Sequence, residues 1–242
     1  MGLSSNIIWH QTDFKGLKAI LTEKCFKCSY SLEDIHWKSS NIQIAFPMLS
    51  FCDIPLSEMG DYIGKYGMYT IGIKREWAQK AGFTPVWYQT EHSPSLIELM
   101  RHRDRLFKED WTDEDILIWS ILSTIKNYQG DLKKYKFKSY RFYDEKEIRY
   151  VPTYNELHDL GIRPFLHSSQ YVEFKQLNKG SSIVPELTLR FESNQIVYIL
   201  ISSLNQRDRI RGLVREYSNY KNIIFLSYKQ IKEDIIGVCH NR

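Results

Sequence analysis

The chain contains 242 residues, of which 43% are hydrophobic and 26% are charged. This composition is typical of a globular protein and excludes a disordered chain or a fibrous repeat. The net charge of +4 permits an anionic partner but lacks the basic bias of a dedicated nucleic-acid-binding protein. No apolar run approaches the ~20 residues of a membrane-spanning helix, and residues 1–6 do not resemble a signal peptide. We therefore expect a cytoplasmic protein without a membrane segment.

The four cysteines do not form a metal-binding pattern. Cys25 and Cys28 are a closely spaced pair, whereas Cys52 and Cys239 stand alone. A structural zinc ion needs four ligands, and the sequence offers no second cysteine pair and no paired histidines. We expect reduced thiols that pack inside the protein, and no metal site.

The first 80 residues predict short strands and helices in alternation. Asp13 can cap the first helix, whose apolar residues share one face. Pro47 is expected to break or bend the second apolar segment at a sheet edge, and Asp53 is expected to cap the short helix that follows. The expected elements are a strand at 7–10, a helix at 14–21, a strand up to residue 30, a strand at 42–51, a helix from about residue 55, a strand at 68–73 and a helix at 76–80.

The middle of the chain has helical spacing. Helices are predicted at 95–107 and 113–127, the second with Thr112 as its cap, and together they form a helical insert over residues 93–130. The lysines that follow fit a solvated loop better than a nucleic-acid site, because four lysines are too few for a convincing patch. They are Lys133, Lys134, Lys136 and Lys138.

The last hundred residues return to mixed elements. The patterns predict strands at 140–151, 171–174, 187–191, 195–202 and 222–226, with helices at 153–160, 204–217 and 229–235. No internal repeat, low-complexity stretch or linker interrupts the chain. The simplest architecture is a single α+β domain over residues 1–242 that contains the helical insert.

Common catalytic fingerprints are absent. The sequence has no Gly-x-Gly-x-x-Gly turn, no phosphate-binding loop that ends in Gly-Lys-Ser or Gly-Lys-Thr, no Gly-x-Ser-x-Gly elbow and no His-Glu-x-x-His helix. These absences disfavour kinases, dehydrogenases and the familiar hydrolases. Candidate chemistry is therefore sought in three polar clusters that interrupt apolar segments.

The first two clusters lie at strand ends. His10 and Thr12 share one side of a strand, where they can hold a ribose or an amide; alternatively, Thr12 merely caps a turn. Ser50 faces away from its neighbours Leu49 and Phe51, although serines are common in strands. Neither pattern is specific alone.

The third cluster is the most informative. On a strand, Glu145, Glu147 and Arg149 project from one face. Two carboxylates at this spacing repel each other, and the arginine can hold one ionised while the pKa of the other rises. Such a face can orient a sugar hydroxyl or stabilise developing positive charge. A solvated edge strand with a ladder of ion pairs is an equal alternative.

Several runs resemble the AbiGi family of abortive phage-resistance proteins, which are described as antitoxins. The most specific is SFCDIPLS at 50–57, within the run 46–57. The other matching pieces are 66–73 (YGMYTIGI), Glu76-Trp77, 143–152 (YDEKEIRYVP) and 230–234 (QIKED). The resemblance implies an anti-phage role and covers most of the chain.

The order of the three clusters also resembles, more distantly, the ADP-ribosyltransferase superfamily. That resemblance implies a split antiparallel β-sheet core with flanking helices and NAD as substrate, without a metal. ADP-ribose would be transferred to a macromolecular acceptor, or NAD would simply be cleaved. The implied roles are ribose binding by His10 and Thr12, a second-strand position for Ser50, nicotinamide stacking by Phe51 or Tyr62, catalysis by Glu147 with Glu145, and Arg149 beside the substrate.

The sequence supports two hypotheses of different classes, an enzyme and a binding protein. As an enzyme, the protein would bring His10, Ser50 and Glu147 to one NAD pocket. As a non-catalytic antitoxin or sensor, it would bind a toxin or a phage component, with Trp87, Tyr88 and Trp111 as contact candidates. Nucleic-acid binding through 133–138 and 207–215 is a third, weaker hypothesis.

Overall fold

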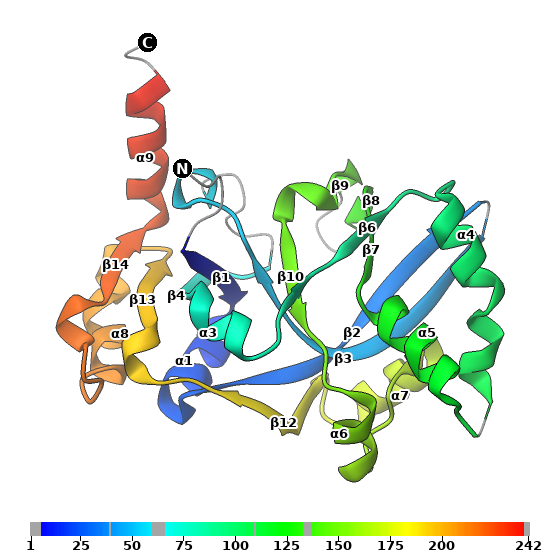
Figure 1. Ribbon diagram of the computed structural model, residues 1–242. Helices are drawn as coiled ribbons and strands as arrows, with labels where there is room; N and C mark the ends of the chain where they lie inside the picture. Colours follow the sequence, from blue (N-terminus) through cyan, green and yellow to red (C-terminus); the bar gives the residue numbers. More distant parts are fainter. Residues whose placement is uncertain (1–5, 39, 60–65, 109, 133–136, 240–242) are drawn as a thin grey trace. The chain divides into compact units, whose positions relative to one another are not determined.

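The computed structural model (Figure 1) describes residues 6–38, 40–59, 66–108, 110–132 and 137–239. The chain forms two compact units: the first contains residues 1–26, 50–83 and 189–242, and the second contains 27–49 and 84–188. Strands β2 (Cys25–Trp37), β3 (Ser40–Cys52) and β12 (Ile183–Arg190) each pass from one unit to the other. This division does not test the prediction of a single domain over residues 1–242, which stays a prediction.

The first unit is built on a mainly antiparallel sheet. Its strand order is β3-β1-β4-β13-β14, and the β13–β14 pair is parallel. The new strands are β1 (Ile7–Thr12), β4 (Tyr69–Lys74), β13 (Ile196–Ile201) and β14 (Ile224–Ser227). The helices are α1 (Phe14–Glu23), α3 (Arg75–Lys80), α8 (Arg207–Leu213) and α9 (Tyr228–Cys239), with single 3-10 turns at Leu56–Glu58, Ser193–Gln195, Leu204–Gln206 and Tyr220–Asn222. The predicted cap of α1 is confirmed, because the Asp13 carboxylate accepts a hydrogen bond from the amide of Gly16 at 2.7 Å.

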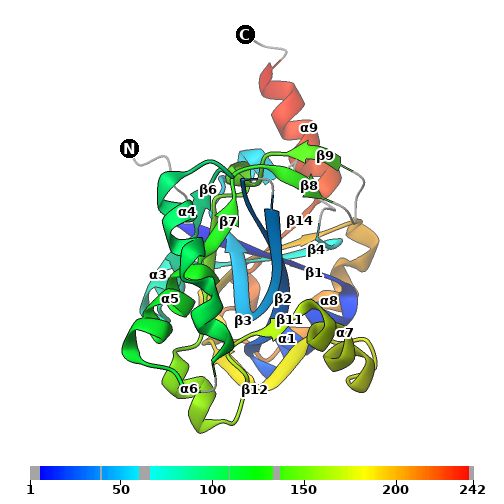
Figure 2. The same ribbon diagram turned by 90° about the vertical axis from the view of Figure 1, so that its right-hand side faces the viewer.

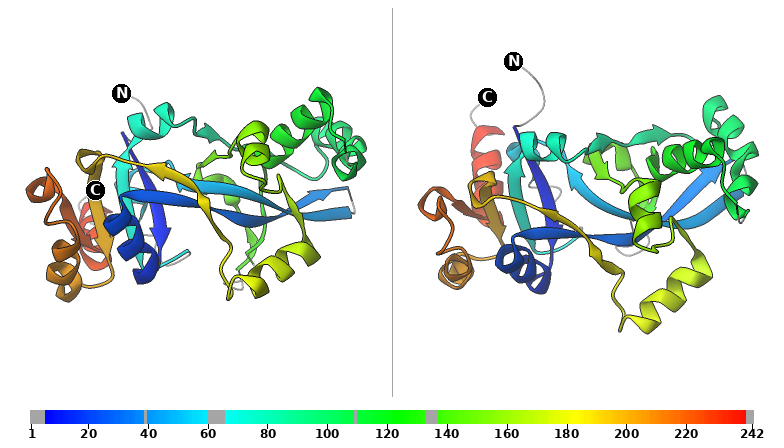
Figure 3. Two further views of the ribbon diagram at one scale, coloured as in Figure 1. Left: turned by 90° about the horizontal axis from the view of Figure 1, so that it is seen from below. Right: turned by 60° about the horizontal axis from the view of Figure 1, so that its bottom comes forward.

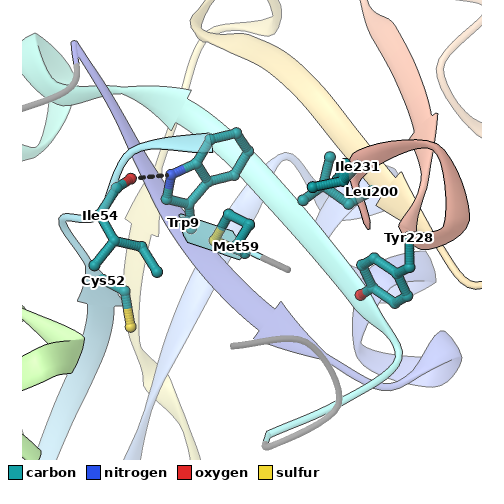
Figure 4. Close-up of a cluster of buried hydrophobic side chains, with 7 residues drawn as sticks. All are labelled: Trp9, Cys52, Ile54, Met59, Leu200, Tyr228 and Ile231. Carbon is teal, nitrogen blue, oxygen red and sulfur yellow. Dashed lines mark hydrogen bonds between the residues drawn. The ribbon is translucent and has the colours of Figure 1, made fainter. Parts of the chain in front are cut away.

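A buried cluster around Trp9 holds the first unit together (Figure 4). Its members come from several elements and are Trp9, Cys52, Ile54, Met59, Leu200, Tyr228 and Ile231. The indole N–H of Trp9 donates to the backbone oxygen of Ile54 at 2.8 Å, so its polar atom is satisfied in the core. Gly72 lies opposite Trp9 in the β1–β4 register and leaves room for the ring.

The second unit contains the long β2–β3 hairpin, seen from two directions in Figure 3. The hairpin register runs from Ser29 opposite Met48 to Trp37 opposite Ser40. Strand β12 lies beside β2, and β11 (Leu166–His167) pairs with β3. The smaller pairs are β5 (Thr84–Pro85) with β10 (Glu147–Tyr150), β6 (Trp87–Gln89) with β7 (Ile125–Asn127), and β8 (Gly130–Leu132) with β9 (Phe137–Tyr140).

Two helices of the second unit begin at side-chain caps, of which Thr112 is the predicted one. Thr112 caps α5 and Thr153 caps α6, each in a reciprocal capping box with the residue three positions on. The helices are α4 (Pro94–Arg101), α5 (Asp113–Ser123), α6 (Tyr154–Asp159) and α7 (Ser168–Leu177), with 3-10 turns at Arg103–Phe107 and Phe142–Glu145. Both α4 and α5 lie within the predicted insert over 93–130. No helix among the described residues is long and apolar enough to cross a membrane.

Two local predictions around β3 are wrong. The strand runs continuously through Pro47, which lies opposite Tyr30, one position from the Ser29–Met48 end of the hairpin register. Asp53 is not a helix cap: both of its carboxylate oxygens accept hydrogen bonds from the guanidinium of Arg75, the first residue of α3. A bidentate ion pair is the stronger use of a carboxylate, because two parallel charge-assisted bonds replace one cap bond.

Other predicted elements change type or length. The strand expected at 140–151 is interrupted by the 3-10 turn at 142–145 and by Lys146, whose φ of 44° breaks the extended backbone. The strand expected at 171–174 is part of α7. The helix expected at 113–127 stops at Ser123, and 125–127 form a strand. The helix expected at 204–217 is reduced to a 3-10 turn followed by α8.

Candidate functional site

The third predicted cluster lies in the interior of the second unit. On β10, Glu147 and Arg149 are both buried and are two positions apart, so the strand places them on one face as predicted. Their partners come from distant segments, Lys126 on β7 and Glu33 on β2. Together Glu33, Lys126, Glu147 and Arg149 form what we call the ionic cluster.

Arg149 is the centre of the ionic cluster. Its side chain has no solvent exposure, its Nε–H donates to Glu147 Oε1 at 2.6 Å and its Nη2–H donates to Glu33 Oε1 at 2.7 Å. Nη1 donates to the backbone oxygens of Ser123 and Ile125 at 3.1 and 3.3 Å. The guanidinium is thus surrounded by acceptors, which compensates for the cost of removing a charge from water.

Lys126 completes the charge balance. Its ammonium lies 3.0 Å from Glu147 Oε2 and 3.8 Å from Glu33 Oε1. Burial alone would lower the pKa of Lys126 and of Arg149, but the two neighbouring glutamates outweigh burial and raise both pKa values. Two anions and two cations make the ionic cluster neutral, with every charge paired.

Glu145 departs from the predicted arrangement. It ends the 3-10 turn at 142–145 and is followed by Lys146 in a left-handed conformation, so it does not continue the alternation of β10. Its side chain is nevertheless buried, and its negative charge contributes to the raised pKa of Lys126. The expectation that Glu145 shares one strand face with Glu147 is therefore wrong.

A tyrosine binds the backbone of Glu147 and continues into a row of three tyrosine rings. The Tyr88 hydroxyl accepts a hydrogen bond from the amide of Glu147 at 2.8 Å. The ring of Tyr143, which is half-exposed, packs edge-on against Tyr88 with centroids 5.2 Å apart and stacks on Tyr128 at 5.3 Å. Sequence reasoning missed Tyr128, because it lies just past a segment predicted to be helical.

The first predicted cluster lies in the first unit, next to Ser50. The ring nitrogen Nδ1 of His10 lies 3.1 Å from the backbone oxygen of Ser50, which makes Nδ1–H the donor. Phe26 and Phe51 pack against the imidazole at centroid distances of 5.3 and 5.1 Å. Burial lowers the pKa of His10 below its usual 6.5, against the smaller opposing effect of the Ser50 hydrogen bond. The imidazole is therefore neutral at pH 7.

The other predicted NAD-binding residues have different surroundings. Phe51 is almost fully buried and packs on Phe83 and Trp77. Thr12 ends β1, and its hydroxyl sits over the first turn of α1, where a side chain at Gly16 would collide with it. Tyr62 lies outside the described residues. Because His10 and Glu147 belong to different units, their convergence on one pocket stays a prediction.

The predicted contact aromatics and basic residues differ in how far they are exposed. Trp87 is 42% exposed, whereas Trp111 is half-buried and stacks on Tyr154 and Phe165. Within the basic stretch at 207–215, Arg209 lies over the ring of Phe14 and Arg211 over that of Phe225. Three of the four connector lysines lie outside the described residues. Cys25, Cys28 and Cys52 are buried and reduced, and no group of described residues has metal-binding geometry.

These features define a mixed α+β protein with a largely antiparallel sheet and a charge-paired interior. Residues 17–202 match the family described as "Putative abortive phage resistance protein AbiGi, antitoxin", and the chain belongs to this AbiGi family. It is similar to the abortive phage resistance protein AbiGi of Lactococcus lactis subsp. cremoris, with 27% identity over 223 residues that cover 78% of this chain and 88% of that protein. No solved structure matches the chain.

Proposed function

We propose that this protein is a non-catalytic antitoxin that protects its host by binding a protein partner. The family description supports the antitoxin role. One structural observation favours binding over catalysis: both carboxylate oxygens of Glu147 are paired with cations, Oε1 with the buried Arg149 and Oε2 with the largely buried Lys126. A catalytic carboxylate must reach the reacting group by a hydrogen bond, whereas these contacts hold strands together.

The test compares growth and binding with NAD consumption. The chain is expressed alone and together with the toxin candidate encoded by a neighbouring gene, and the purified protein is incubated with NAD. We expect no growth arrest by the chain alone, relief of the arrest caused by the partner, and copurification of the two proteins. Nicotinamide release should not exceed that of Glu147→Gln. Growth arrest by the chain alone that Glu147→Gln abolishes would exclude the proposal.

A second candidate function is the ADP-ribosyltransferase-like use of NAD. The observation that favours it is the contact between His10 and Ser50, which places two of the implied residues on neighbouring strands of one sheet. In this proposal His10 and Thr12 would hold the nicotinamide-side ribose and Glu147 would act on it. Nicotinamide release by the wild type, but not by Glu147→Gln, with cell lysate as acceptor would favour this candidate over the antitoxin.

A further inference from the structure

An open groove lies between α6 and β12 in the second unit, two elements that are neighbours in Figure 2. The cavity in it has a volume of about 280 Å³. Tyr150 and the buried Leu187 line it together with three carboxylates, Glu156 and Asp159 from α6 and Glu186 from β12. The groove therefore combines an apolar base with an acidic rim.

Strand β12, which lines one side of this groove, is an edge strand of its sheet. It stands at the end of the strand order, beside β2, so the described part of the sheet has no further strand on its other side. Edge strands carry backbone N–H and C=O groups without a ladder partner, which can pair with an extended chain. Pro185 within β12 has no amide N–H, so it leaves no unpaired donor at this edge.

The acidic rim is not neutralised from within. Among the described residues, Glu156 and Glu186 form no ion pair, and Asp159 has a 3.7 Å contact to the exposed His158. Glu156 also accepts hydrogen bonds from the amide and hydroxyl of Thr153. Burial and then the charge of Glu156 raise the pKa of Cys28 to about 12.

The placement of the carboxylates on two elements indicates the shape of the ligand. Glu156 and Asp159 stand on α6 and Glu186 on β12, so the anions line the groove from two elements. Alternate side chains of an extended peptide lie roughly 6.5–7 Å apart on one face, which suits several separated anions. Phosphate groups of a nucleic acid would be repelled by the same carboxylates.

We propose that an extended, lysine- or arginine-bearing segment of a partner protein binds along the edge of β12. Its backbone pairs with β12, and its cationic side chains enter the groove against Glu156, Asp159 and Glu186. The inference rests on the proposed binding function and specifies the chemistry of the partner segment.

The first experiment uses a synthetic peptide as the probe. A fluorescent, terminally blocked peptide of alternating lysine and threonine is titrated with the full chain, and binding is followed by fluorescence anisotropy. We expect saturable binding that weakens as salt is added, since exposed charge pairs are screened. A peptide with glutamate in place of lysine should not bind. A peptide with N-methyl groups on alternate amides should lose affinity, because it cannot complete the backbone ladder.

Variants locate the peptide on the protein. The double variant Asp159→Asn with Glu186→Gln should weaken binding about 3- to 20-fold, from two exposed charge pairs of ordinary strength. Glu173→Gln, which neutralises an exposed carboxylate on α7 of the same unit, should leave binding unchanged. Both substituted positions of the double variant are exposed, and unchanged thermal unfolding verifies its fold.

The outcomes separate this inference from the proposed function. Equal peptide affinity of the wild type and the double variant, or full affinity of the N-methylated peptide, overturns the groove assignment. Peptide binding at the groove by a chain that fails to neutralise its partner would leave the site valid and refute the antitoxin proposal. Neutralisation that the double variant retains in full would refute the groove and leave the antitoxin proposal intact.

Discussion

Replacement of the buried guanidinium is the sharpest test of the ionic cluster. Arg149→Met keeps the length and apolar stem of the side chain but removes contacts to Glu147, Glu33 and two backbone oxygens. Lys126 is then left with two carboxylates in the interior. Breaking a buried ion pair by removing one partner costs about 3–5 kcal/mol. For a chain of this length, that corresponds to a decrease in melting temperature of roughly 6–20 °C.

The assay is thermal and urea unfolding followed by circular dichroism at neutral pH. The matched control is Arg141→Met, which removes an exposed ion pair with Asp144 and should change stability by less than about 1 kcal/mol. If the free energy of unfolding of Arg149→Met is within 1 kcal/mol of that of the wild type, the cluster contributes little to stability, and its structural role is refuted. If Arg149→Met is already unfolded at room temperature, the variant has lost more folding free energy than expected, which still supports a structural role of the cluster.

Three further predictions concern the first unit and one helix cap. Burial lowers the pKa of His10, so the unfolded chain binds a proton below about pH 6.5 that the folded chain resists. The free energy of unfolding should therefore decrease as the pH falls below about 6.5, by up to about 1.4 kcal/mol per pH unit. In urea unfolding, His10→Gln should make this pH dependence weaker, whereas replacement of the exposed His92 by Gln should leave it unchanged. Gly72→Ala places a methyl group 2.6 Å from the Trp9 ring and should cost about 1–3 kcal/mol, whereas Gly212→Ala, on a helix with open space around it, should stabilise by up to about 1 kcal/mol. Equal effects of the two alanines on melting temperature would contradict this packing argument. Thr112→Ala should destabilise the protein by about 1 kcal/mol through loss of the α5 cap, and an unchanged urea midpoint would refute that.

The sequence predicts correctly those elements whose ends are fixed by contacts between residues close in the chain. The caps at Asp13 and Thr112 can be predicted because in each a side chain bonds to an amide only three residues away. The segment at 171–174 shows the limit of this approach, since its tyrosine, valine and phenylalanine favour a strand. In α7 the Gln170 side chain accepts a hydrogen bond from the amide of His167, and Phe174 packs on Tyr30 far away in sequence. Those contacts outweigh the local preference.

The sequence predicts only the part of the candidate site that lies on one strand. The alternation of a strand predicts that Glu147 and Arg149 share a face, and they do. Glu33 precedes Arg149 by 116 positions, and Lys126 lies on a segment that reads as the end of a helix. Residues 125–127 form a strand because they pair with residues 87–89. The spacing of apolar residues within one segment cannot predict such a long-range pairing.

The two sets of acidic residues in the second unit differ in what neutralises them, and this difference separates their roles. In the ionic cluster, Arg149 and Lys126 match two carboxylates and tie together β2, β7 and β10. A shift of β10 by one residue would turn Arg149 to the opposite face and leave its partners unpaired, so the cluster favours one strand register. Along the groove, by contrast, Glu156 and Glu186 have no ion-pair partner among the described residues and line a pocket beside the edge strand β12. Charges that are balanced internally maintain the fold, whereas charges that lack an internal partner are the ones that an external cation can recognise.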